Sequence, residues 1–465
     1  MFIDDTICAI ATATGIGALG IIRISGNQAI DVSNSIFKGK NLQKVDSHTI
    51  HYGFIKDENN QAIDEVMVSV FRAPKTFTAE DLVEITCHGS PYIQQKIIET
   101  LQKKGVRLAN PGEFSQRAFL NGRIDLSQAE AIADLIAAEA KESHQLALNQ
   151  LKGGFSIDLK RMRQELIEFV ALIELELDFS EEDVEFANRD NLVQLLDNLL
   201  QKIDPLIESF SYGNAIKQGI PVAILGKPNA GKSTLLNLLL NEERAIVSSI
   251  PGTTRDTIEE KLTIEGIDFR FIDTAGIRQT NDEIESLGIK KTFEKAKESD
   301  IILYLFDKEN TTIDEVIDNY NSIKTNENFV IICATKMDKY PNFDWNEWKN
   351  TIPNFPESIL FVELSSKDKK YIQTLKNCLT DYIHSLKKSS QHSTHIVVNQ
   401  RHYQELIQTK TALEKSKQSL QTGVSGDFIS FDLKNALLHL GNITGEIEVD
   451  KDILGTIFGK FCIGK

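Results

Sequence analysis

The sequence contains little cysteine, and its five cysteines are scattered along 465 residues. They form no CxxC pair and no cluster with histidine, which argues against a disulfide scaffold and against a zinc site. Cysteine used in this way is typical of a reducing cytoplasm. The five positions are Cys8, Cys87, Cys333, Cys378 and Cys462.

Long apolar runs are also missing. No stretch approaches the roughly 18 consecutive apolar residues that a membrane span needs. We expect no signal peptide at the start of the sequence, because Asp4 and Asp5 interrupt its short apolar stretch. The expected location is therefore cytoplasmic, with no membrane partner.

Positive charge is scarce as well. The chain has 51 lysines and arginines against 67 aspartates and glutamates, a formal net charge of -16. This balance argues against a broad basic surface, so any nucleic acid must be held by a local patch or with the help of a partner protein.

A phosphate-binding loop is present near the middle of the chain, as Gly226-Lys227-Pro228-Asn229-Ala230-Gly231-Lys232-Ser233. It matches the pattern GxxxxGK[ST] and lies between an apolar run at 220–225 and a helical pattern at 234–240, as such a loop must. Backbone N–H groups of this loop are expected to surround a polyphosphate at the positive end of the following helix. We expect Lys232 to reach the outer phosphates and Ser233 to bind a magnesium ion.

Further elements follow in the order of a GTPase domain. Asp273-Thr274-Ala275-Gly276 is a DxxG sequence, whose aspartate reaches magnesium through water and whose glycine N–H senses the γ-phosphate. Upstream, Thr254 is the candidate switch threonine and a second magnesium ligand. Thr335-Lys336-Met337-Asp338 resembles the guanine-reading NKxD motif with threonine in place of asparagine, and Ser365-Ser366-Lys367 resembles the segment that backs the base. Because the Asp338 carboxylate can accept hydrogen bonds from guanine N1–H and N2–H₂, we expect GTP rather than ATP.

The glutamine that orients the attacking water in Ras-like enzymes is absent. Ile277 stands in its place and can neither donate nor accept a hydrogen bond. A carboxylate in the segment just downstream can position water instead, or these charges can simply solvate a loop. The charged residues of this segment are Arg278, Asp282, Glu283 and Glu285.

The first 120 residues predict an α+β domain. Strands are expected at 6–11, 20–25, 48–55, 65–71 and 81–87, and a helix at 92–103. The segment from Gly15 to Gly20 reads GxGxxG, but β-branched residues follow it where a dinucleotide site needs a helix. We therefore interpret it as a glycine-rich turn between two strands. Arg23, Glu84 and Arg123 lie near strand or loop ends and can be surface ion-pair members or ligands.

From about Leu126 the apolar residues recur with a spacing of 3.6, which predicts helices. Ser127 and Glu130 have the spacing of a capping box. Helical patterns continue at 157–177 and 192–210, stop near Tyr212-Gly213, and resume after about residue 384 at 404–420, 432–440 and 450–458.

The economical interpretation is a doubly wound P-loop GTPase domain inserted into an all-α domain whose two halves pack together. Two unrelated helical pieces would give the same pattern. The predicted boundaries are 1–120 for the N-terminal α+β domain, 121–214 and 385–465 for the two helical parts, and 215–384 for the GTPase domain.

Taken together, the chain resembles the tRNA-modification GTPase family MnmE, also called TrmE, over essentially its whole length. Other GTPases share only the central module, so the resemblance depends on segments outside it. These are Thr12-Ala13-Thr14-Gly15 with Gly20-Ile21-Ile22-Arg23-Ile24-Ser25-Gly26, Glu84-Ile85-Thr86-Cys87-His88-Gly89, Asn110-Pro111-Gly112-Glu113-Phe114 with Arg117-Ala118-Phe119-Leu120-Asn121-Gly122, Asp125-Leu126-Ser127-Gln128-Ala129-Glu130-Ala131, and Phe461-Cys462-Ile463-Gly464-Lys465.

The resemblance implies a set of site residues. A 5-formyl- or methylene-tetrahydrofolate cofactor would meet Arg23, Glu84, Arg123 and Lys465. Arg123 stands where the family often has lysine, which keeps the charge but not its geometry. A potassium ion would be held by Asn229, Ser248, Ile250 and Thr253, Glu285 would orient water, and Cys462 would take part in the modification chemistry. The implied GTP contacts are Asn229, Ala230, Gly231, Lys232, Ser233, Thr234, Ser248, Ser249, Ile250, Pro251, Gly252, Thr253, Thr254, Asp273, Thr274, Ala275, Gly276, Thr335, Lys336, Asp338, Ser365, Ser366 and Lys367.

The resemblance also implies a function. Family members form homodimers and hydrolyse GTP, stimulated by potassium and coupled to domain closure. With an FAD-containing MnmG-type partner they build a carboxymethylaminomethyl- or aminomethyl-type group on C5 of the wobble uridine, U34, of certain tRNAs. The alternative is a regulatory or ribosome-assembly GTPase that switches partners and has no one-carbon cofactor of its own. Binding of a reduced folate by the first domain would distinguish the two.

Overall fold

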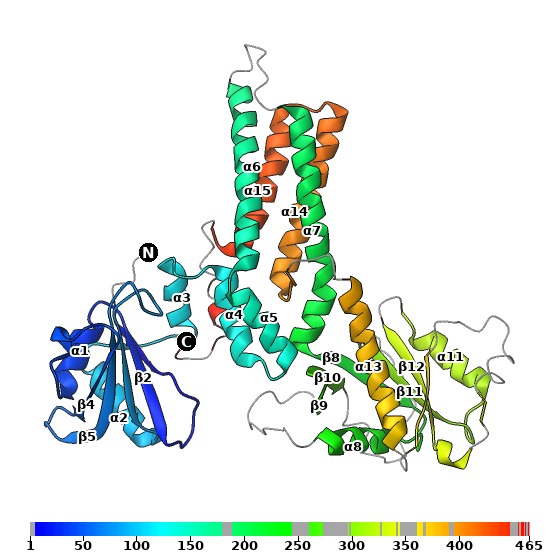
Figure 1. Cartoon of the computed structure of the whole chain (residues 1–465), viewed down its shortest axis with the longest axis horizontal. Helices are drawn as coiled ribbons and strands as arrows, with labels where there is room; N and C mark the ends of the chain where they lie inside the picture. The colour runs from blue at the N-terminus through cyan, green and yellow to red at the C-terminus, as the bar shows by residue number, and fades with distance from the viewer. Residues whose placement is uncertain are drawn as a thin grey trace. The chain divides into compact units, whose positions relative to one another are not determined.

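A computed structural model describes most of the chain (Figure 1). The described residues are 5–178, 188–243, 260–272, 296, 299–325, 328–340, 343–344, 360–365, 369–389, 395–446, 454, 457–459, 461 and 464. The chain divides into two compact units, and each is described by itself. The first unit comprises Met1–Ala137, Ala147–Val193 and Thr411–Lys465, and the second comprises Ala138–Leu146 and Gln194–Lys410.

The first unit begins with a seven-stranded sheet in the order β3-β4-β5-β6-β2-β1-β7. Its pairs are antiparallel, except that β1 runs parallel to the edge strand β7. The glycine-rich segment lies between β1 and the start of β2, so its interpretation as a turn is confirmed. The strands are β1 (Ile7–Ile10), β2 (Leu19–Ser25), β3 (Phe37–Lys38), β4 (Thr49–Lys56), β5 (Ala62–Phe71), β6 (Leu82–His88) and β7 (Arg107–Leu108).

Two helices cover one face of this sheet. Side chains of α1 (Ala29–Ile36) and α2 (Pro91–Gln102) join the inward residues of the strands in one hydrophobic core. Side chains on the opposite face are solvent-exposed at several apolar positions, which alternate with buried ones as the two-residue period of a strand requires. These are Leu19, Ile50, Tyr52 and Met67, with exposed fractions of 61%, 65%, 62% and 48%.

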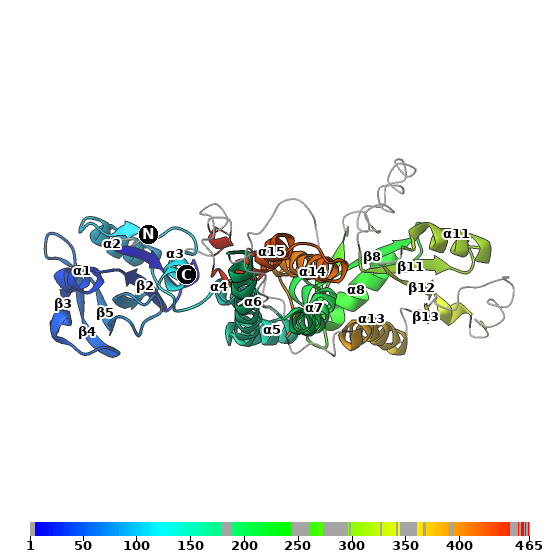
Figure 2. The same cartoon turned by 90° about the horizontal axis from the view of Figure 1, so that it is seen from above.

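Further helices of the first unit lie among its described residues. They are α3 (Glu113–Leu120), α4 (Leu126–Ala137), the end of α5 (Lys141–Leu151), α6 (Gly154–Asp178), the start of α7 (Arg189–Gln218), the end of α14 (Gln400–Thr422) and α15 (Gly426–Thr444). Although α6 and α15 are far apart in the sequence, they lie side by side in both views (Figures 1 and 2). Lys434 and Glu174 join these two helices by an ion pair of 2.8 Å.

The capping box at the start of α4 lies two residues before the predicted position. The backbone N–H of Gln128 donates to the Asp125 carboxylate at 3.0 Å, and the backbone N–H of Asp125 donates to the Gln128 side chain at 3.0 Å. This reciprocal pair satisfies two N–H groups that the helix cannot use. The predicted pairing of Ser127 with Glu130 was therefore wrong, and the Ser127 hydroxyl instead contacts Ser156 at 2.7 Å.

The second unit is built on a six-stranded sheet in the order β13-β12-β11-β8-β10-β9. All pairs are parallel except β9 with β10. Along β8 and β11, successive side chains belong to two different hydrophobic cores, so the sheet is covered on both faces. The strands are β8 (Ile220–Gly226), β9 (Glu260–Ile264), β10 (Ile267–Ile272), β11 (Ile301–Asp307), β12 (Phe329–Thr335) and β13 (Leu360–Glu363).

Helices supply the two cores of this sheet. The end of α7 (Arg189–Gln218) packs on one face with α8 (Lys232–Glu243) and α13 (Lys369–Ser389). On the other face lies α11 (Ile313–Ile323), whose start carries a capping box between Thr312 and Glu315. Within the part of the chain that the structure describes, no helix is both long and apolar enough to cross a membrane.

The predicted helix end at Tyr212-Gly213 was wrong, because α7 continues to Gln218. A Cβ on Gly213 would lie 2.2 Å from the carbonyl oxygen of Val397, so this glycine permits a close backbone approach. Gly219, with a φ of +74°, follows the helix in the left-handed conformation typical of a helix C-terminus. Together the described elements give the expected architecture of an α+β domain, long helices, and a doubly wound α/β domain between helical segments.

Candidate functional site

The phosphate-binding loop connects β8 to α8, so strand, loop and helix stand in the predicted order. Its backbone enters the left-handed region at Gly226 (φ +147°), Asn229 (φ +61°) and Gly231 (φ +96°). A Cβ on Gly226 would lie 2.3 Å from the carbonyl oxygen of Leu305, which only glycine avoids. The loop therefore has the tight backbone path that a polyphosphate cradle requires.

Lys232 is held by the loop to which it belongs. Its Nζ donates to the carbonyl oxygens of Gly226 at 2.6 Å and of Lys227 at 3.0 Å. The next residues, Ser233 and Thr234, lie in the first turn of α8, at the positive end of the helix dipole. The Lys232 charge and this helix end thus lie where an anion would bind.

The segment predicted to read guanine, Thr335-Lys336-Met337-Asp338, lies beside this loop. A Cβ built on Gly231 would lie 3.7 Å from Cγ2 of Thr335. The Thr335 hydroxyl donates to the carbonyl oxygen of Phe306 at 3.0 Å, and the Ser365 hydroxyl donates to the Asp338 carboxylate at 3.1 Å. The structure thus brings the phosphate loop, Thr335, Asp338 and Ser365 to one end of the sheet, beyond the carboxyl ends of β8 and β12.

The lysine of this segment is tied to a buried carboxylate. Lys336 Nζ lies 2.5 Å from Asp307 Oδ2, and the Asp307 side chain is only 3% exposed. Burial raises the pKa of Asp307, but hydrogen bonds from Lys336 and from the backbone of Glu309 lower it by more. The pKa of Asp307 therefore lies below the usual value. Asp307 therefore stays ionised and fixes Lys336 beside the predicted base site.

A cavity of about 470 Å³ lies in the first unit, at residues from well-separated parts of the sequence. Of the predicted folate ligands, Glu84 and Arg123 line it. Sequence reasoning missed its other residues, because none stands in a recognisable motif. They are His48, Phe71, Pro74, Lys75, Thr76, Phe77 and Leu82.

Arg23 forms an ion pair with a residue that lines this cavity. Its Nη2 lies 2.8 Å from Glu84 Oε1, and strand register places the two residues opposite each other on β2 and β6. The guanidinium groups of Arg23 and Arg123 both lie over the Phe77 ring, at 5.2 Å and 5.1 Å. The interpretation of Arg23 and Glu84 as ion-pair members is confirmed, and Glu84 of this pair lines the cavity.

The C-terminal segment reaches the same place. Arg23 Nη1 donates to the carbonyl oxygen of Gly464 at 3.5 Å, and the Phe458 ring packs near Phe119 of α3 with centroids 6.5 Å apart. A Cβ on Gly464 would lie 2.3 Å from the carbonyl oxygen of Ile10. The tail therefore packs closely against β1 and the Arg23–Glu84 pair.

The remaining predicted site residues lie outside the described residues, and their roles stay predictions. They are Ser248, Ser249, Ile250, Pro251, Gly252, Thr253, Thr254, Asp273, Thr274, Ala275, Gly276, Glu285, Ser366, Lys367, Cys462 and Lys465. Among the residues that are described, no group of three or more His, Cys, Asp or Glu side chains could hold a metal ion.

Comparison with known proteins covers the whole chain. Residues 6–123 match the profile of the N-terminus of the GTP-binding protein TrmE, and residues 126–462 match that of the MnmE helical domain. The tRNA modification GTPase MnmE of Cytophaga hutchinsonii is 48% identical over 99% of this chain and 98% of its own length. The protein of the same name from Flavobacterium johnsoniae is also 48% identical, over 100% of both chains.

Among solved structures, the G domain of the T. maritima FeoB iron transporter matches 35% of this chain and 98% of its own chain. The match has 22% identity and a TM-score of 0.26. The full-length sequence identity carries the assignment. The chain belongs to the MnmE family of tRNA modification GTPases and is a GTP hydrolase.

Proposed function

We propose that this GTPase is the GTP-hydrolysing component of a complex that modifies C5 of the tRNA wobble uridine, U34. An FAD-containing MnmG-type protein would be its partner, and the product a carboxymethylaminomethyl- or aminomethyl-type uridine. The single observation that carries this proposal is the presence of two separate sites in one chain. A phosphate loop and a guanine-reading segment meet in the second unit, while the first unit has its own cavity at Glu84 and Arg123.

In this proposal residues 215–384 form the GTPase domain. The loop from Asn229 to Thr234 binds the phosphates of GTP, and Asp338 reads the guanine edge with support from Ser365. Magnesium would be held by Ser233 and Thr254. Potassium would be held by Asn229, Ser248, Ile250 and Thr253. These cations would neutralise the charge of the triphosphate, and Glu285 would orient the attacking water.

Residues 1–120 form the cofactor domain in this proposal. The cavity volume of about 470 Å³ falls in the range of small-molecule sites. Its wall combines the aromatic rings of Phe71 and Phe77 with the cations of Lys75 and Arg123. Aromatic faces suit a pterin ring and cations suit the carboxylates of a folate, so a 5-formyl- or methylene-tetrahydrofolate fits this chemistry. Lys465 and Cys462 would complete the site from the tail.

A homodimer is part of the same proposal. The sheet face opposite α1 and α2 exposes Leu19 on β2, Ile50 and Tyr52 on β4, and Met67 on β5. An exposed apolar face of this kind is typical of an interaction surface. We assign it to a second copy of the chain, and residues 121–214 and 385–465 to the helical domain that connects the parts.

Potassium dependence provides one test. In place of the missing glutamine, a cation would stabilise the charge that develops during hydrolysis. We therefore expect GTP turnover to be roughly tenfold or more faster in potassium than in sodium at equal ionic strength. Equal rates in the two salts would remove the potassium site from the proposal. Glu285→Ala should retain GTP binding and slow turnover, and an unchanged rate would reject its role.

The complete function requires an assay on RNA. Transcribed tRNA is incubated with this chain, the flavoprotein partner, a reduced folate and GTP, and modified uridine is measured by mass spectrometry. We expect product with GTP and none with a non-hydrolysable analogue. No product under either condition would contradict the proposed reaction, and equal product under both would contradict the coupling to hydrolysis.

A further inference from the structure

One loop supplies four of the cavity's lining residues. This cavity loop, defined as residues 74–81, connects β5 to β6 and contributes Pro74, Lys75, Thr76 and Phe77 to the wall. A loop of this length can adopt many conformations, and each would place the wall differently. The shape of the cavity therefore depends on what holds residues 74–81 in place.

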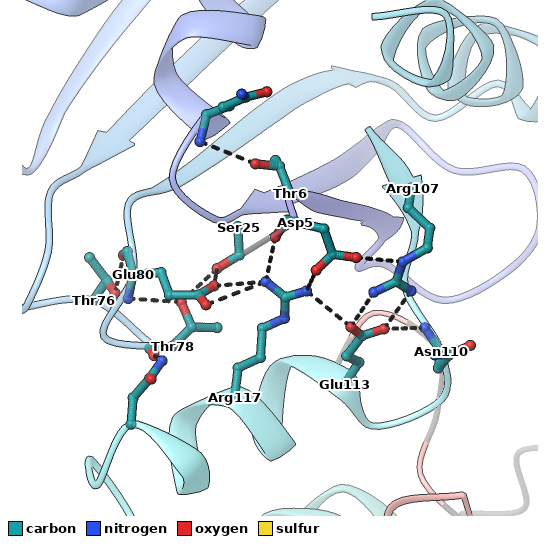
Figure 3. Close-up of polar contacts among 12 residues, drawn as sticks. Asp5, Thr6, Ser25, Thr76, Thr78, Glu80, Arg107, Asn110, Glu113 and Arg117 are labelled. Carbon is teal, nitrogen blue, oxygen red and sulfur yellow. Dashed lines mark hydrogen bonds and ion pairs between the residues drawn. The ribbon is translucent and has the colours of Figure 1, made fainter. Parts of the chain in front are cut away.

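Contacts within the cavity loop close it on itself. The Thr76 hydroxyl donates to the carbonyl oxygen of Glu80 at 2.6 Å, and the backbone N–H of Glu80 donates to the Thr78 hydroxyl at 3.3 Å. The Ser25 hydroxyl, at the end of β2, contacts Thr78 Oγ1 at 2.7 Å and donates to Glu80 Oε2 at 2.8 Å. These bonds fix the base of the loop to the sheet (Figure 3).

A second set of contacts comes from α3 and the turn after it. The Asn121 side-chain amide donates to the carbonyl oxygen of Thr78 at 2.7 Å, and Arg123 Nη1 donates to that of Phe77 at 2.6 Å. Arg117 Nη1 lies 3.3 Å from both carboxylate oxygens of Glu80. Three residues of one short segment therefore hold the cavity loop.

Arg117 is itself fixed by several partners. Its side chain is 1% exposed and donates to the carbonyl oxygen of Asp5 at 2.8 Å, to Asp5 Oδ1 at 2.6 Å and to Glu113 Oε1 at 3.1 Å. Arg107 binds the same two carboxylates, at 2.7 Å and 2.6 Å (Figure 3). A guanidinium with this many partners has one position, so Glu80 and the loop that carries it are held against a rigid point.

The charges of this network stay in place at neutral pH. Burial raises the pKa of Asp5 and of Glu113, but hydrogen bonds from Arg107 and Arg117 lower it by more, so both pKa values lie below their usual range. Both carboxylates are therefore ionised partners of Arg117 in the folded chain.

We propose that Arg117 and Asn121 are positioning residues of the cofactor cavity. Without touching the ligand, they hold the cavity loop in the conformation that places Lys75 and Phe77 in the wall. This role explains why Arg117 and Asn121 occur in the segment Arg117-Ala118-Phe119-Leu120-Asn121, to which the GTPase elements assign no function. This inference rests on the proposed folate site. Loosening the loop should weaken ligand binding, because the entropy cost of ordering the loop then falls on the binding step.

The test uses Asn121→Ala in the full chain, because Asn121 is exposed at the end of α3 and its loss should leave the fold intact. Gln116→Ala is the matched control: it removes an amide from the same helix, for which the structure records no hydrogen bond. Calorimetric titration with 5-formyltetrahydrofolate should show binding about three- to tenfold weaker in Asn121→Ala, the equivalent of one lost hydrogen bond. Gln116→Ala should bind like the wild type.

Hydrogen exchange supplies a readout that needs no ligand. Backbone amides of residues 74–81 should exchange faster in Asn121→Ala, and faster also in Asn121→Asp, which keeps the side-chain volume but sets a carboxylate against the Thr78 carbonyl. GTP turnover and the thermal midpoint should be the same in the variants as in the wild type.

The outcomes separate this inference from the proposed function. If the wild type binds the folate and Asn121→Ala binds it equally well with unchanged exchange, the positioning role is overturned. If the wild type binds no folate, the proposed cofactor is wrong. Exchange of residues 74–81 then still decides whether Asn121 holds the loop: faster exchange supports this, and unchanged exchange rejects it.

Discussion

The cavity loop of the first unit and the phosphate loop of the second are held by different means. The phosphate loop is held largely by its own atoms, with Lys232 donating to the carbonyl oxygens of Gly226 and Lys227. The cavity loop is held by Ser25, Arg117 and Asn121, which come from other parts of the chain. A change within a few residues can therefore disable the phosphate loop, whereas the cavity also depends on residues that are distant in the sequence.

The two sheets differ in a matching way. The parallel sheet of the second unit is covered on both faces, and its site lies at the carboxyl ends of the strands. In the mainly antiparallel sheet of the first unit, α1 and α2 cover one face, and the other face carries the Arg23–Glu84 pair. In the first unit, therefore, we expect side-chain charges rather than strand ends to define where a ligand binds.

Of the variants that test this comparison, Arg117→Met should have the largest effect on stability. It leaves the carboxylates of Asp5, Glu80 and Glu113 without their shared buried partner, and breaking such a network costs about 3–5 kcal/mol. We expect the first unit to unfold at lower urea, as read by hydrogen exchange in β1 and β6, with little change in the phosphate-loop peptide. Equal loss in both units, or no loss in either, would contradict the comparison.

Lys232→Ala should have the converse effect. It removes the cation predicted to reach the outer phosphates, and the loss of one such contact slows catalysis by roughly 10²–10³-fold. GTP turnover should fall by about this factor, while the urea midpoint of the first unit stays unchanged. A variant that hydrolyses GTP normally would show that the loop is not the phosphate site.

Acid should weaken the first unit through the carboxylates that pair with Arg117. The pKa values of Asp5 and Glu113 are lowered in the folded chain, so their stabilisation is present above the unfolded pKa and is lost as pH falls through the folded one. We expect thermal stability of the first unit to fall between about pH 5 and pH 3. Arg117→Met should show a smaller fall, and an equal fall would mean that the network does not set this pH dependence.

The smallest effect is expected from Lys227→Met. Lys227 Nζ pairs with Glu315 at 2.8 Å in the second unit, but both side chains are more than two-fifths exposed. Water and salt screen such a pair, so its contribution is small. We expect no measurable change in the urea midpoint, in contrast to Arg117→Met. A loss as large as that of Arg117→Met would break the distinction between buried and exposed ion pairs.

The sequence predicted local features well and assembled sites poorly. The phosphate loop was predictable because its residues are contiguous and each has a fixed task. Of the cavity's residues only Glu84 and Arg123 were expected, through the family resemblance, because His48, Lys75 and Phe77 come together only through strand pairing and a loop. The pairing of Arg23 with Glu84 likewise depends on the register of β2 with β6, which the sequence does not specify.

Two local predictions were wrong because a residue has several uses. Gly213 was interpreted as a helix end, but it lies inside α7. The absence of a side chain there leaves room for the carbonyl oxygen of Val397. Ser127 was interpreted as a cap, but Asp125 performs this task two residues earlier. In both cases tertiary contacts decided between two chemically reasonable positions.

The most direct test of two independent sites is hydrogen exchange of the wild-type chain with each ligand in turn. We expect 5-formyltetrahydrofolate to slow hydrogen exchange in residues 74–81 and to leave exchange in residues 226–235 unchanged. We expect GTP to slow exchange in residues 226–235. Folate protection that is absent from residues 74–81, or that appears at the phosphate loop, would contradict these expectations.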